Sequence, residues 1–288
     1  MKKKKILILG ASGMAGHIIY YYLKETNKYE IFDVVFHNKI RQESIVLDVS
    51  NKLDTENLIR VVNPDIIINC IGILINGSNQ YPDNAIYINA FLPHFLVRLS
   101  GNIGAKLIHI STDCVFSGKK GKYSEENFRD ADDIYGRSKA LGEVNNEKDI
   151  TIRTSIIGPE IKKNGEGLFH WFMHQNGEIN GFTESIWSGV TTLELAKTIE
   201  VVIYNNLTGL INLSNGKGIN KFDLLNLIKL IWGKDNINIQ PFFGKKVDKS
   251  LRKSALYNFN VPTYKKMLQE LKIWMDSHTY LYQNIYRY

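Results

Sequence analysis

Residues 6–16 read ILILGASGMAG, an unbroken apolar run followed by three glycines at every third position. The apolar run predicts a strand buried on both faces, and the glycines predict a tight turn into a helix. At such a turn the free N–H groups and the positive end of the helix can hold a dinucleotide pyrophosphate. Gly10 allows the turn, Gly13 the close approach of a ligand, and Gly16 the packing of helix on strand. The spacing is not G-x-G-x-x-G, so the position between strand and helix is what favours a dinucleotide over a purely structural turn.

The first half of the chain alternates apolar runs with helical patterns. Strands are predicted at 6–9, 31–36, 44–47, 65–71, 106–110 and 150–154, and helices at about 14–24, 53–62 and 85–99. Strands without polar alternation indicate a parallel sheet covered by helices on both faces. The predicted fold class is therefore α/β, with a Rossmann-type doubly wound parallel sheet.

A change of pattern after Gly158-Pro159 predicts a second, smaller unit. Glycine and aromatic residues are frequent there, helices are expected at about 191–204, 221–232 and 262–274, and a strand at 209–213. We interpret this part as a smaller C-terminal α/β substrate lobe. The expected division is a dinucleotide-binding Rossmann domain at 1–158 and a substrate-binding lobe at 159–288, which returns in part to the first domain around 186–213.

Composition narrows the classes of function. The chain has 36 Lys+Arg and 29 Asp+Glu, a net charge of +7 that suits an anionic small molecule, although Lys2–Lys5 supply part of it. No basic stripe is interleaved with aromatic residues, so nucleic acid is not an expected partner. Cys70 and Cys114 are the two cysteines, which indicates a reducing compartment. The apolar run at 6–9 is too short for a signal peptide or a membrane span, so we expect a cytoplasmic protein without a membrane partner.

The residues after the second strand bear on the choice of nicotinamide. A carboxylate there would bind the ribose hydroxyls and repel a 2′-phosphate. The stretch reads FHNKIR and contains none, whereas His37, Lys39 and Arg41 could face a phosphate. This favours NADP(H), with NAD(H) as the alternative. Asp48 and Val49, at the end of the third strand, are expected near the adenine; a solvated loop carboxylate is the other interpretation of Asp48.

A tyrosine and a lysine form the centre of the expected reactive site. The motif YGRSK places Tyr135 and Lys139 one helical turn apart on one face. A phenol titrates near ~10, and a nearby ammonium lowers that pKa toward working pH, where acid–base catalysis is efficient. Thr112 ends the fifth strand, and ligands bind at the carboxyl ends of parallel strands, so its hydroxyl can orient a substrate oxygen. Ser111 is either a second hydroxyl of the site or the end of the strand.

Three motifs together resemble the extended short-chain dehydrogenase/reductase superfamily: the glycine turn, STDCVFSG at 111–118 and YGRSK at 135–139. Within it the chain resembles the dTDP-4-dehydrorhamnose reductase branch, which reduces 4-keto sugars carried on nucleotides. The similarity covers about residues 5–158 and is looser beyond. It implies that Thr112 orients the keto oxygen, that Tyr135 donates the proton, and that Lys139 supports both the tyrosine and the nicotinamide ribose.

Further ligand contacts follow from the turn and from the resemblance. Residues expected to bind the cofactor are Gly10, Ser12, Gly13, Met14, Gly16, His37, Asp48, Val49, Cys70, Ile71, Gly72, Asn89, Tyr135 and Lys139. Residues expected to bind the substrate are Ser111, Thr112, Trp187 and Lys249. For the last two, a core aromatic and a solvated charge are the alternatives. His170 and His174 are four apart but lack a third ligand, so no metal is expected.

The expected function is NAD(P)H-dependent reduction of a 4-keto-6-deoxy sugar on dTDP or UDP, in surface polysaccharide biosynthesis. Members of the branch usually carry Tyr where this chain has Cys114, which leaves the product sugar open; with no His placed to activate it, Cys114 is expected to be a packing residue. A dehydratase would need Glu after Asp113. The alternatives are a sugar-nucleotide epimerase of the same superfamily and a non-catalytic dinucleotide-binding regulatory subunit. Dimers through sheet-flanking helices are common in the superfamily, so a homodimer is compatible with the resemblance.

Overall fold

A seven-stranded sheet is the central element of the computed structural model, which describes residues 2–244 and 246–286. Its order is β11-β6-β5-β4-β1-β2-β3, and every neighbouring pair is parallel. The strands are β1 (Lys4–Leu9), β2 (Tyr29–Val35), β3 (Ile45–Val46), β4 (Ile66–Asn69), β5 (Lys106–Thr112), β6 (Ile150–Thr154) and β11 (Gly209–Asn212). The order reverses between β1 and β4, where doubly wound sheets bind their ligands. The predicted fold class is confirmed.

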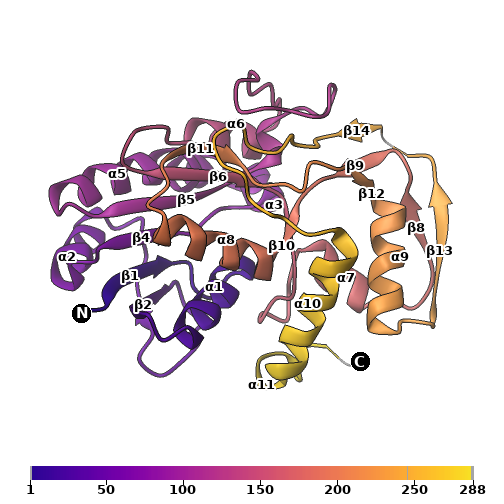
Figure 1. Cartoon of the computed structure of the whole chain (residues 1–288), viewed down its shortest axis with the longest axis horizontal. Helices are drawn as coiled ribbons and strands as arrows, with labels where there is room; N and C mark the ends of the chain where they lie inside the picture. The colour runs from indigo at the N-terminus through magenta and orange to yellow at the C-terminus, as the bar shows by residue number, and fades with distance from the viewer. Residues whose placement is uncertain (1, 245, 287–288) are drawn as a thin grey trace.

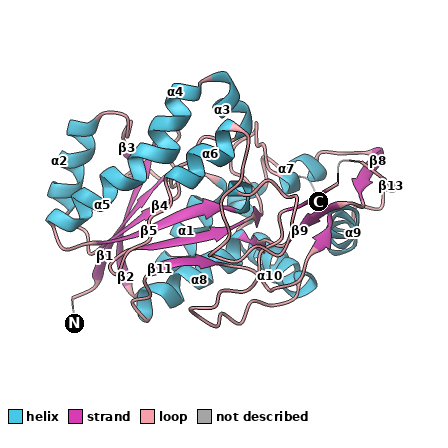
Figure 2. Ribbon diagram, turned by 90° about the horizontal axis from the view of Figure 1, so that it is seen from above, coloured by secondary structure: helices cyan, strands magenta, loops and turns pink. Residues whose placement is uncertain are grey.

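Helices cover both faces of the sheet (Figure 2). On one face lie α1 (Met14–Glu25) and α8 (Thr192–Tyr204), and on the other α2 (Lys52–Val62) and α5 (Leu92–Asn102). The side chains of β1 alternate between the two layers: Ile6 and Ile8 pack with α1 and α8, whereas Leu7 and Leu9 pack with α2 and α5. All four are fully buried, which explains why β1 is apolar without interruption.

The helix expected at about 85–99 is divided into three parts. They are α4 (Pro82–Ala85), the π-helical segment η1 (Ile86–Phe91) and α5. Pro93 has no N–H to donate to the preceding turn, so the α-helical register is interrupted just before it. Asn89 lies in the wider turn of η1. A Cβ added to Gly142 would lie only 1.9 Å from the backbone carbonyl oxygen of Asn89. The interruption therefore lies where η1 packs directly against α6 (Ile134–Leu141).

The rest of the chain builds the smaller lobe, on the right of Figure 1. It contains α7 (Leu168–Met173), β8 (Gly177–Phe182), β9 (Ser185–Trp187), β12 (Ile219–Asn220), α9 (Lys221–Trp232), β13 (Ile237–Phe242) and β14 (Val247–Asp248). The short pair β7 (Ile156–Ile157) and β10 (Val190–Thr191) lies where the chain passes between the two parts. Between β10 and β12 the chain returns to the first sheet to add α8 and β11.

Two helices end the chain, α10 (Tyr264–Ser277) and α11 (Thr279–Tyr282), drawn in yellow in Figure 1. Helix α10 packs against both α8 and α9, so it contacts an element of each part of the molecule. Two further short elements are α3 (Ile75–Gln80) and the 3-10 turn η2 (Asp113–Val115). Within the described ranges, the helices are too short or too polar to traverse a lipid bilayer.

Candidate active site

The glycine turn between β1 and α1 has the shape that a pyrophosphate requires. Gly10 has φ +80°, which favours glycine, and a Cβ at Gly16 would lie 2.2 Å from the carbonyl oxygen of Gly10. The amide of Gly10 donates to the carbonyl of Val34 at 3.0 Å, which holds the turn over the end of β2. Gly13 is the N-cap of α1, and no side chain caps the helix there. The first amides of α1 are therefore left for an anionic ligand.

The loop after β4 lies beside this turn and leads to the lysine. A Cβ added to Gly72 would lie 4.0 Å from Nζ of Lys139 and 3.6 Å from Oδ1 of Asn89. The Asn89 side chain accepts from the amide of Ile73 at 2.9 Å and donates to its carbonyl at 3.0 Å. Asn89 thus fixes the loop that starts at Cys70. The glycine leaves room next to the ammonium, as a nicotinamide ribose would need.

The cationic side chains after β2 differ in whether a carboxylate already binds them. The Arg41 guanidinium is bound by two carboxylates, Asp33 at 2.6 Å and Glu43 at 3.0 Å. His37 and Lys39 are exposed. Of the three side chains that could face a 2′-phosphate, Arg41 is therefore already neutralised, and the other two remain at the surface.

Asp48 is exposed, and its carboxylate accepts from the amide of Ser50 at 2.9 Å, in the turn that leads to α2. Val49 beside it is buried in the core under α2 and α5. Asp48 thus stabilises its own loop, and any contact to an adenine would use the remaining oxygen. Ser12 and Met14 lie within the glycine turn as expected from their positions, the first buried and the second half-buried.

The predicted reactive residues come together at the carboxyl end of β5. The Tyr135 phenol lies close enough to the Thr112 side chain for that side chain to lower its pKa, and Nζ of Lys139 donates to the carbonyl oxygen of Ile110 at 2.8 Å. The Thr112 hydroxyl also accepts from the amide of Cys114 at 3.1 Å, which fixes its position as the cap of η2. The phenol and the hydroxyl thus lie together at the end of β5, and the ammonium lies between the carbonyl of Ile110 and Gly72.

The protonation states differ from the simple expectation. Burial raises the pKa of Tyr135, and the neighbouring Thr112 side chain has a smaller opposing effect. The expected lowering of the phenol pKa by the ammonium is not found: Lys139 is not among the main groups that shift this pKa, and desolvation dominates. Burial also lowers the pKa of Lys139 to about 8, while the carboxylate of Glu143 acts in the opposite direction. At neutral pH the tyrosine is a protonated acid beside a charged lysine.

The lobe contributes a cation to this cluster. Lys249, which follows β14, lies near the thiol of Cys114 and the buried carboxylate of Asp113. Burial lowers the pKa of Lys249, but Cys114, Asp113 and Asp133 together more than offset it, so the net shift is upward. Burial raises the pKa of the Cys114 thiol to about 11, so it is a thiol at neutral pH. Lys249 therefore reaches the two residues that follow Thr112, and it does so from the smaller lobe.

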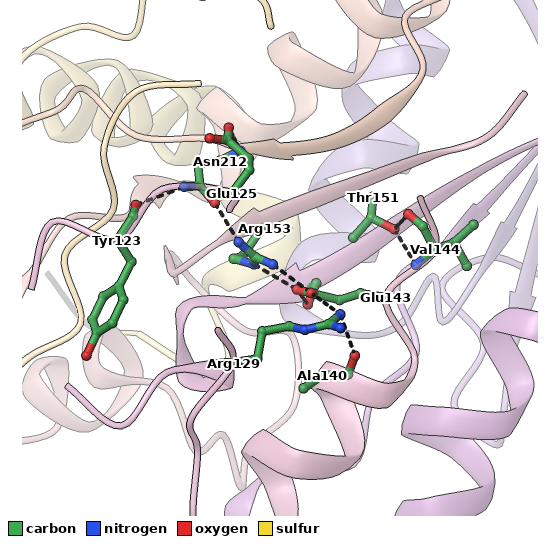
Figure 3. A network of polar contacts seen from close by, with 10 residues as sticks. Tyr123, Glu125, Arg129, Ala140, Glu143, Val144, Thr151, Arg153 and Asn212 are labelled. Atoms are coloured by element: carbon green, nitrogen blue, oxygen red, sulfur yellow. Dashed lines mark hydrogen bonds and ion pairs between the residues drawn. The ribbon is translucent and has the colours of Figure 1, made fainter. Parts of the chain in front are cut away.

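Ser111 points away from the cluster, because successive side chains of β5 face opposite sides. Its hydroxyl donates to Glu143 at 2.8 Å. The same carboxylate receives two hydrogen bonds from Arg153, at 2.8 and 2.7 Å, and one from Arg129 at 3.1 Å (Figure 3). Arg153 also donates to the side chain of Asn212 at 3.2 Å, in β11. The network therefore joins α6, β5, β6 and β11 behind the reactive residues, and Ser111 belongs to it.

Trp187 and the pair His170 and His174 are also held by contacts within the protein. The Trp187 indole N–H donates to Ser155 at 2.8 Å, and its ring packs 5.5 Å from that of Tyr264, so only 8% of the residue is exposed. Its ring is a core aromatic here rather than an open stacking face. His170 and His174 bind backbone carbonyls. Among residues 2–244 and 246–286, no three His, Cys, Asp or Glu side chains are grouped to hold a metal ion.

Glu143 is the residue near the site that sequence reasoning did not identify. It follows Lys139 by four positions, and its carboxylate is fully buried. A charged residue, Arg153, in the otherwise uncharged strand ITIRT is the signal that could have revealed it, since a buried cation requires a partner.

A glycine turn for a pyrophosphate and a Thr–Tyr–Lys cluster on a doubly wound sheet define an extended short-chain dehydrogenase/reductase fold. The model of the RmlD substrate binding domain family matches residues 4–284, and the chain belongs to this family. Among solved structures, the dTDP-4-dehydrorhamnose reductase of Bacillus anthracis in complex with NADP is 24% identical, with a TM-score of 0.81, and covers 94% of this chain and 99% of that one. A hypothetical dTDP-4-dehydrorhamnose reductase of Sulfolobus tokodaii is 28% identical, with a TM-score of 0.74, over 86% of this chain and 91% of that one.

Curated relatives carry three kinds of name. The spore coat polysaccharide biosynthesis protein SpsK of Bacillus subtilis is 26% identical over 73% of each chain. The dTDP-4-dehydrorhamnose reductase of Aggregatibacter actinomycetemcomitans is 29% identical over 52% of this chain and 51% of its own length. Methionine adenosyltransferase 2 subunit beta of Xenopus laevis is 26% identical over 57% of this chain and 50% of its own. The match thus spans about half the length of the last two.

Proposed function

We propose that this protein reduces the keto group of a nucleotide-linked 4-keto-6-deoxy sugar with NADP(H), as a step in surface polysaccharide synthesis. The observation that carries the proposal is the position of the Tyr135 phenol next to the Thr112 side chain at the carboxyl end of β5, with the Lys139 ammonium bound to the carbonyl of Ile110 in the same strand. The names of the reductase and SpsK relatives support the substrate class.

The residues of this chain have separate tasks in such a reaction. Thr112 and Tyr135 hydrogen-bond the keto oxygen, and Tyr135 gives its proton to that oxygen as negative charge develops there. Lys139, charged below about pH 8, stabilises the phenolate that remains. The bound reduced nicotinamide supplies the hydride. Lys249 offsets the charge of Asp113 and offers a positive group to the substrate side of the cluster.

NADP(H) is the proposed cofactor for two reasons. The residues after β2 contain exposed His37 and Lys39 where an NAD-specific site would place a carboxylate. The Bacillus anthracis neighbour was solved with NADP. Another neighbour, the dTDP-glucose 4,6-dehydratase of the same organism, was solved with NAD, but at 16% identity that likeness concerns the fold. NAD(H) is therefore the alternative to test beside it.

We also propose a homodimer that works in the cytoplasm. Apolar side chains stand exposed on two segments that pack against each other, Ile86 at 55% and Phe91 at 39% on η1 and Leu141 at 68% on α6. Exposed apolar side chains on neighbouring helical segments are suited to pairing with a second copy of the chain. Light scattering of the purified protein at micromolar concentration tests the dimer, and a monomeric mass would contradict it.

The central experiment is Tyr135→Phe, assayed by NADPH oxidation with dTDP- and UDP-linked 4-keto-6-deoxy sugars. Removal of the acid is expected to lower turnover by roughly 10²-fold or more while NADPH still binds. Tyr204→Phe, at a residue that is 85% exposed, is the matched control and should behave as the wild type. Full turnover in Tyr135→Phe would refute the assignment.

The second candidate function is that of a dinucleotide-binding subunit of another enzyme. It is favoured by the relatives named methionine adenosyltransferase 2 subunit beta, from frog to rodents, at 26–28% identity. The two proposals differ in one measurement. A reductase consumes NADPH in proportion to a keto sugar, whereas a subunit binds NADPH without turnover and alters the activity of the enzyme with which it copurifies.

A further inference from the structure

The C-terminal segment 279–286 reaches the glycine turn through one histidine. Nδ1 of His17 lies 2.8 Å from the carbonyl oxygen of Gly13, and Nε2 lies 3.0 Å from the hydroxyl of Tyr282. His17 and Tyr282 are both fully buried. Tyr282 is 265 positions from His17 in the sequence. Through His17 it is nevertheless linked to the Gly13 carbonyl of the turn that we propose to hold the pyrophosphate.

The carbonyl group of Gly13 determines which ring nitrogen of His17 carries the proton. Burial lowers the pKa of His17 to about 4, so the ring is neutral and carries one proton. Because the Gly13 oxygen can only accept, that proton is on Nδ1, and Nε2 accepts from the Tyr282 hydroxyl. The Gly13 oxygen also receives the backbone N–H of His17 at 3.2 Å.

Two donors on the Gly13 oxygen restrict the peptide plane between Gly13 and Met14. In a trans peptide the N–H points opposite to the C=O. Fixing the Gly13 oxygen toward His17 therefore directs the Met14 N–H outward from the start of α1, where a pyrophosphate would lie.

A second tyrosine, one helical turn later, acts on the other side of the turn. The Tyr286 hydroxyl accepts from the amide of Glu160 at 2.8 Å and lies 3.0 Å from Nδ1 of His170. The Glu160 carboxylate in turn accepts from the amide of Gly167 at 2.7 Å. A Cβ at Gly167 would lie 2.3 Å from Cε of Met14, so segment 160–167 rests directly on the turn.

We propose that segment 279–286 is part of the dinucleotide site: Tyr282, through His17, and Tyr286, through Glu160, are positioning residues for the turn at 10–16. This inference rests on the proposed function, because it assumes that the turn binds NADP(H). It assigns a role in cofactor affinity to the end of the chain, more than 260 residues from the turn, and none in the proton transfer at Tyr135.

The test is the affinity of Tyr282→Phe for NADPH, measured by calorimetry on the full chain without substrate. Loss of one hydroxyl leaves Nε2 of His17 without its donor, and the dissociation constant should rise about threefold to tenfold. At saturating NADPH, kcat should equal that of the wild type. Amide exchange at residues 13–17 of the cofactor-free protein should be faster in the variant. Tyr280→Phe, on the same helix and 59% exposed, is the control that should change neither quantity.

The possible results distinguish a failure of this inference from a failure of the proposed function. If the wild type binds NADPH and Tyr282→Phe binds it within twofold as tightly, the segment is only structural and the inference is wrong. A lower melting temperature with unchanged affinity has the same meaning. If the wild type binds neither NADPH nor NADH, the proposed function fails, and this inference with it. If Tyr282→Phe fails to fold, the same measurement is made on Tyr286→Phe, which acts through segment 160–167.

Discussion

The Nζ atom of Lys139 lies 2.8 Å from the carbonyl oxygen of Ile110, two residues before Thr112. This hydrogen bond ties α6 to the end of β5, so the lysine holds the tyrosine and threonine hydroxyls in register as well as supplying charge. Lys139→Met removes both effects, and we expect kcat/KM to fall by roughly 10²-fold or more. NADPH oxidation measures it. Lys265→Met, at an exposed position, should retain full activity, and equal activity in both variants would contradict the role of Lys139.

The pH dependence should report the same lysine. Burial lowers the pKa of Lys139 to about 8 and raises that of Tyr135 above its ordinary value, so the lysine loses its proton first as pH increases. Activity needs the ammonium, and kcat/KM should therefore be constant below about pH 8 and decrease above it. Lys139→Arg keeps the charge at high pH, so the decrease should move upward in whatever activity remains. A profile that rises through pH 8 would be inconsistent with this account.

The Glu143 network should matter more for stability than for chemistry. Glu143→Gln leaves the guanidinium of Arg153, 1% exposed, without its carboxylate, and should cost about 3–5 kcal/mol of unfolding free energy. Ser111→Ala removes one of several hydrogen bonds and should cost about 0.5–1.5 kcal/mol. Urea denaturation measures both, with Glu147→Gln at the surface as the control.

A double variant tests whether that cost comes from the unpaired charge. Glu143→Met with Arg153→Met removes both ions together, so it should be less destabilised than Glu143→Gln alone. If the double variant were the less stable of the two, the buried ion pair would not be the source of the cost.

The two cysteines should be unreactive in the native protein. Burial raises the pKa of Cys114 to about 11 and that of Cys70 to about 12, so few thiolates exist at neutral pH. A thiol reagent at pH 7 should label both at the normal rate in denaturant and far more slowly in the folded state. Fast labelling of native Cys114 would mean that Lys249 activates the thiol instead of merely contacting it.

Lys39 offers a test of the cofactor preference. It is exposed and Nζ donates only to a backbone carbonyl, that of Gln42, whereas Arg41 nearby is bound by the carboxylates of Asp33 and Glu43, so Lys39 can turn toward a 2′-phosphate. Lys39→Ala should raise the dissociation constant for NADPH by about fivefold, the scale of one exposed charge pair, and leave that for NADH unchanged. Equal effects on both cofactors would place the 2′-phosphate elsewhere.

Much of the fold could be predicted because its signals are local. The strand at Ile150–Thr154 and the helix at Lys221–Trp232 have the bounds that the pattern indicated. The helix expected at about 85–99 is present, but its π-helical segment η1 was not foreseen, because the pattern does not show how one missing N–H, at Pro93, shifts a register. The pair β8 and β13 was not expected, because β8 contains two glycines and β13 a proline, and each strand is stabilised by the other.

The candidate site, too, could be predicted only where its residues lie close together in the sequence. Tyr135, Lys139 and Thr112 lie within 28 residues of one another and follow from strand and helix periodicity. Lys249 is more than 100 positions away, and only the packing of the lobe brings it to Cys114. The side to which Ser111 points follows from alternation along β5, but its partner Glu143 required the tertiary structure.

The position of β11 in the sheet has a consequence for synthesis of the chain. This strand pairs with β6, yet 54 residues separate the two in sequence. A ribosome that has released residues 1–158 has therefore produced a sheet with an unpaired outer edge, which other nascent chains can extend. Half-length fragments should thus precipitate on expression, and gene fusions or split reporters should be cut after residue 212 and not at the apparent border of the two parts.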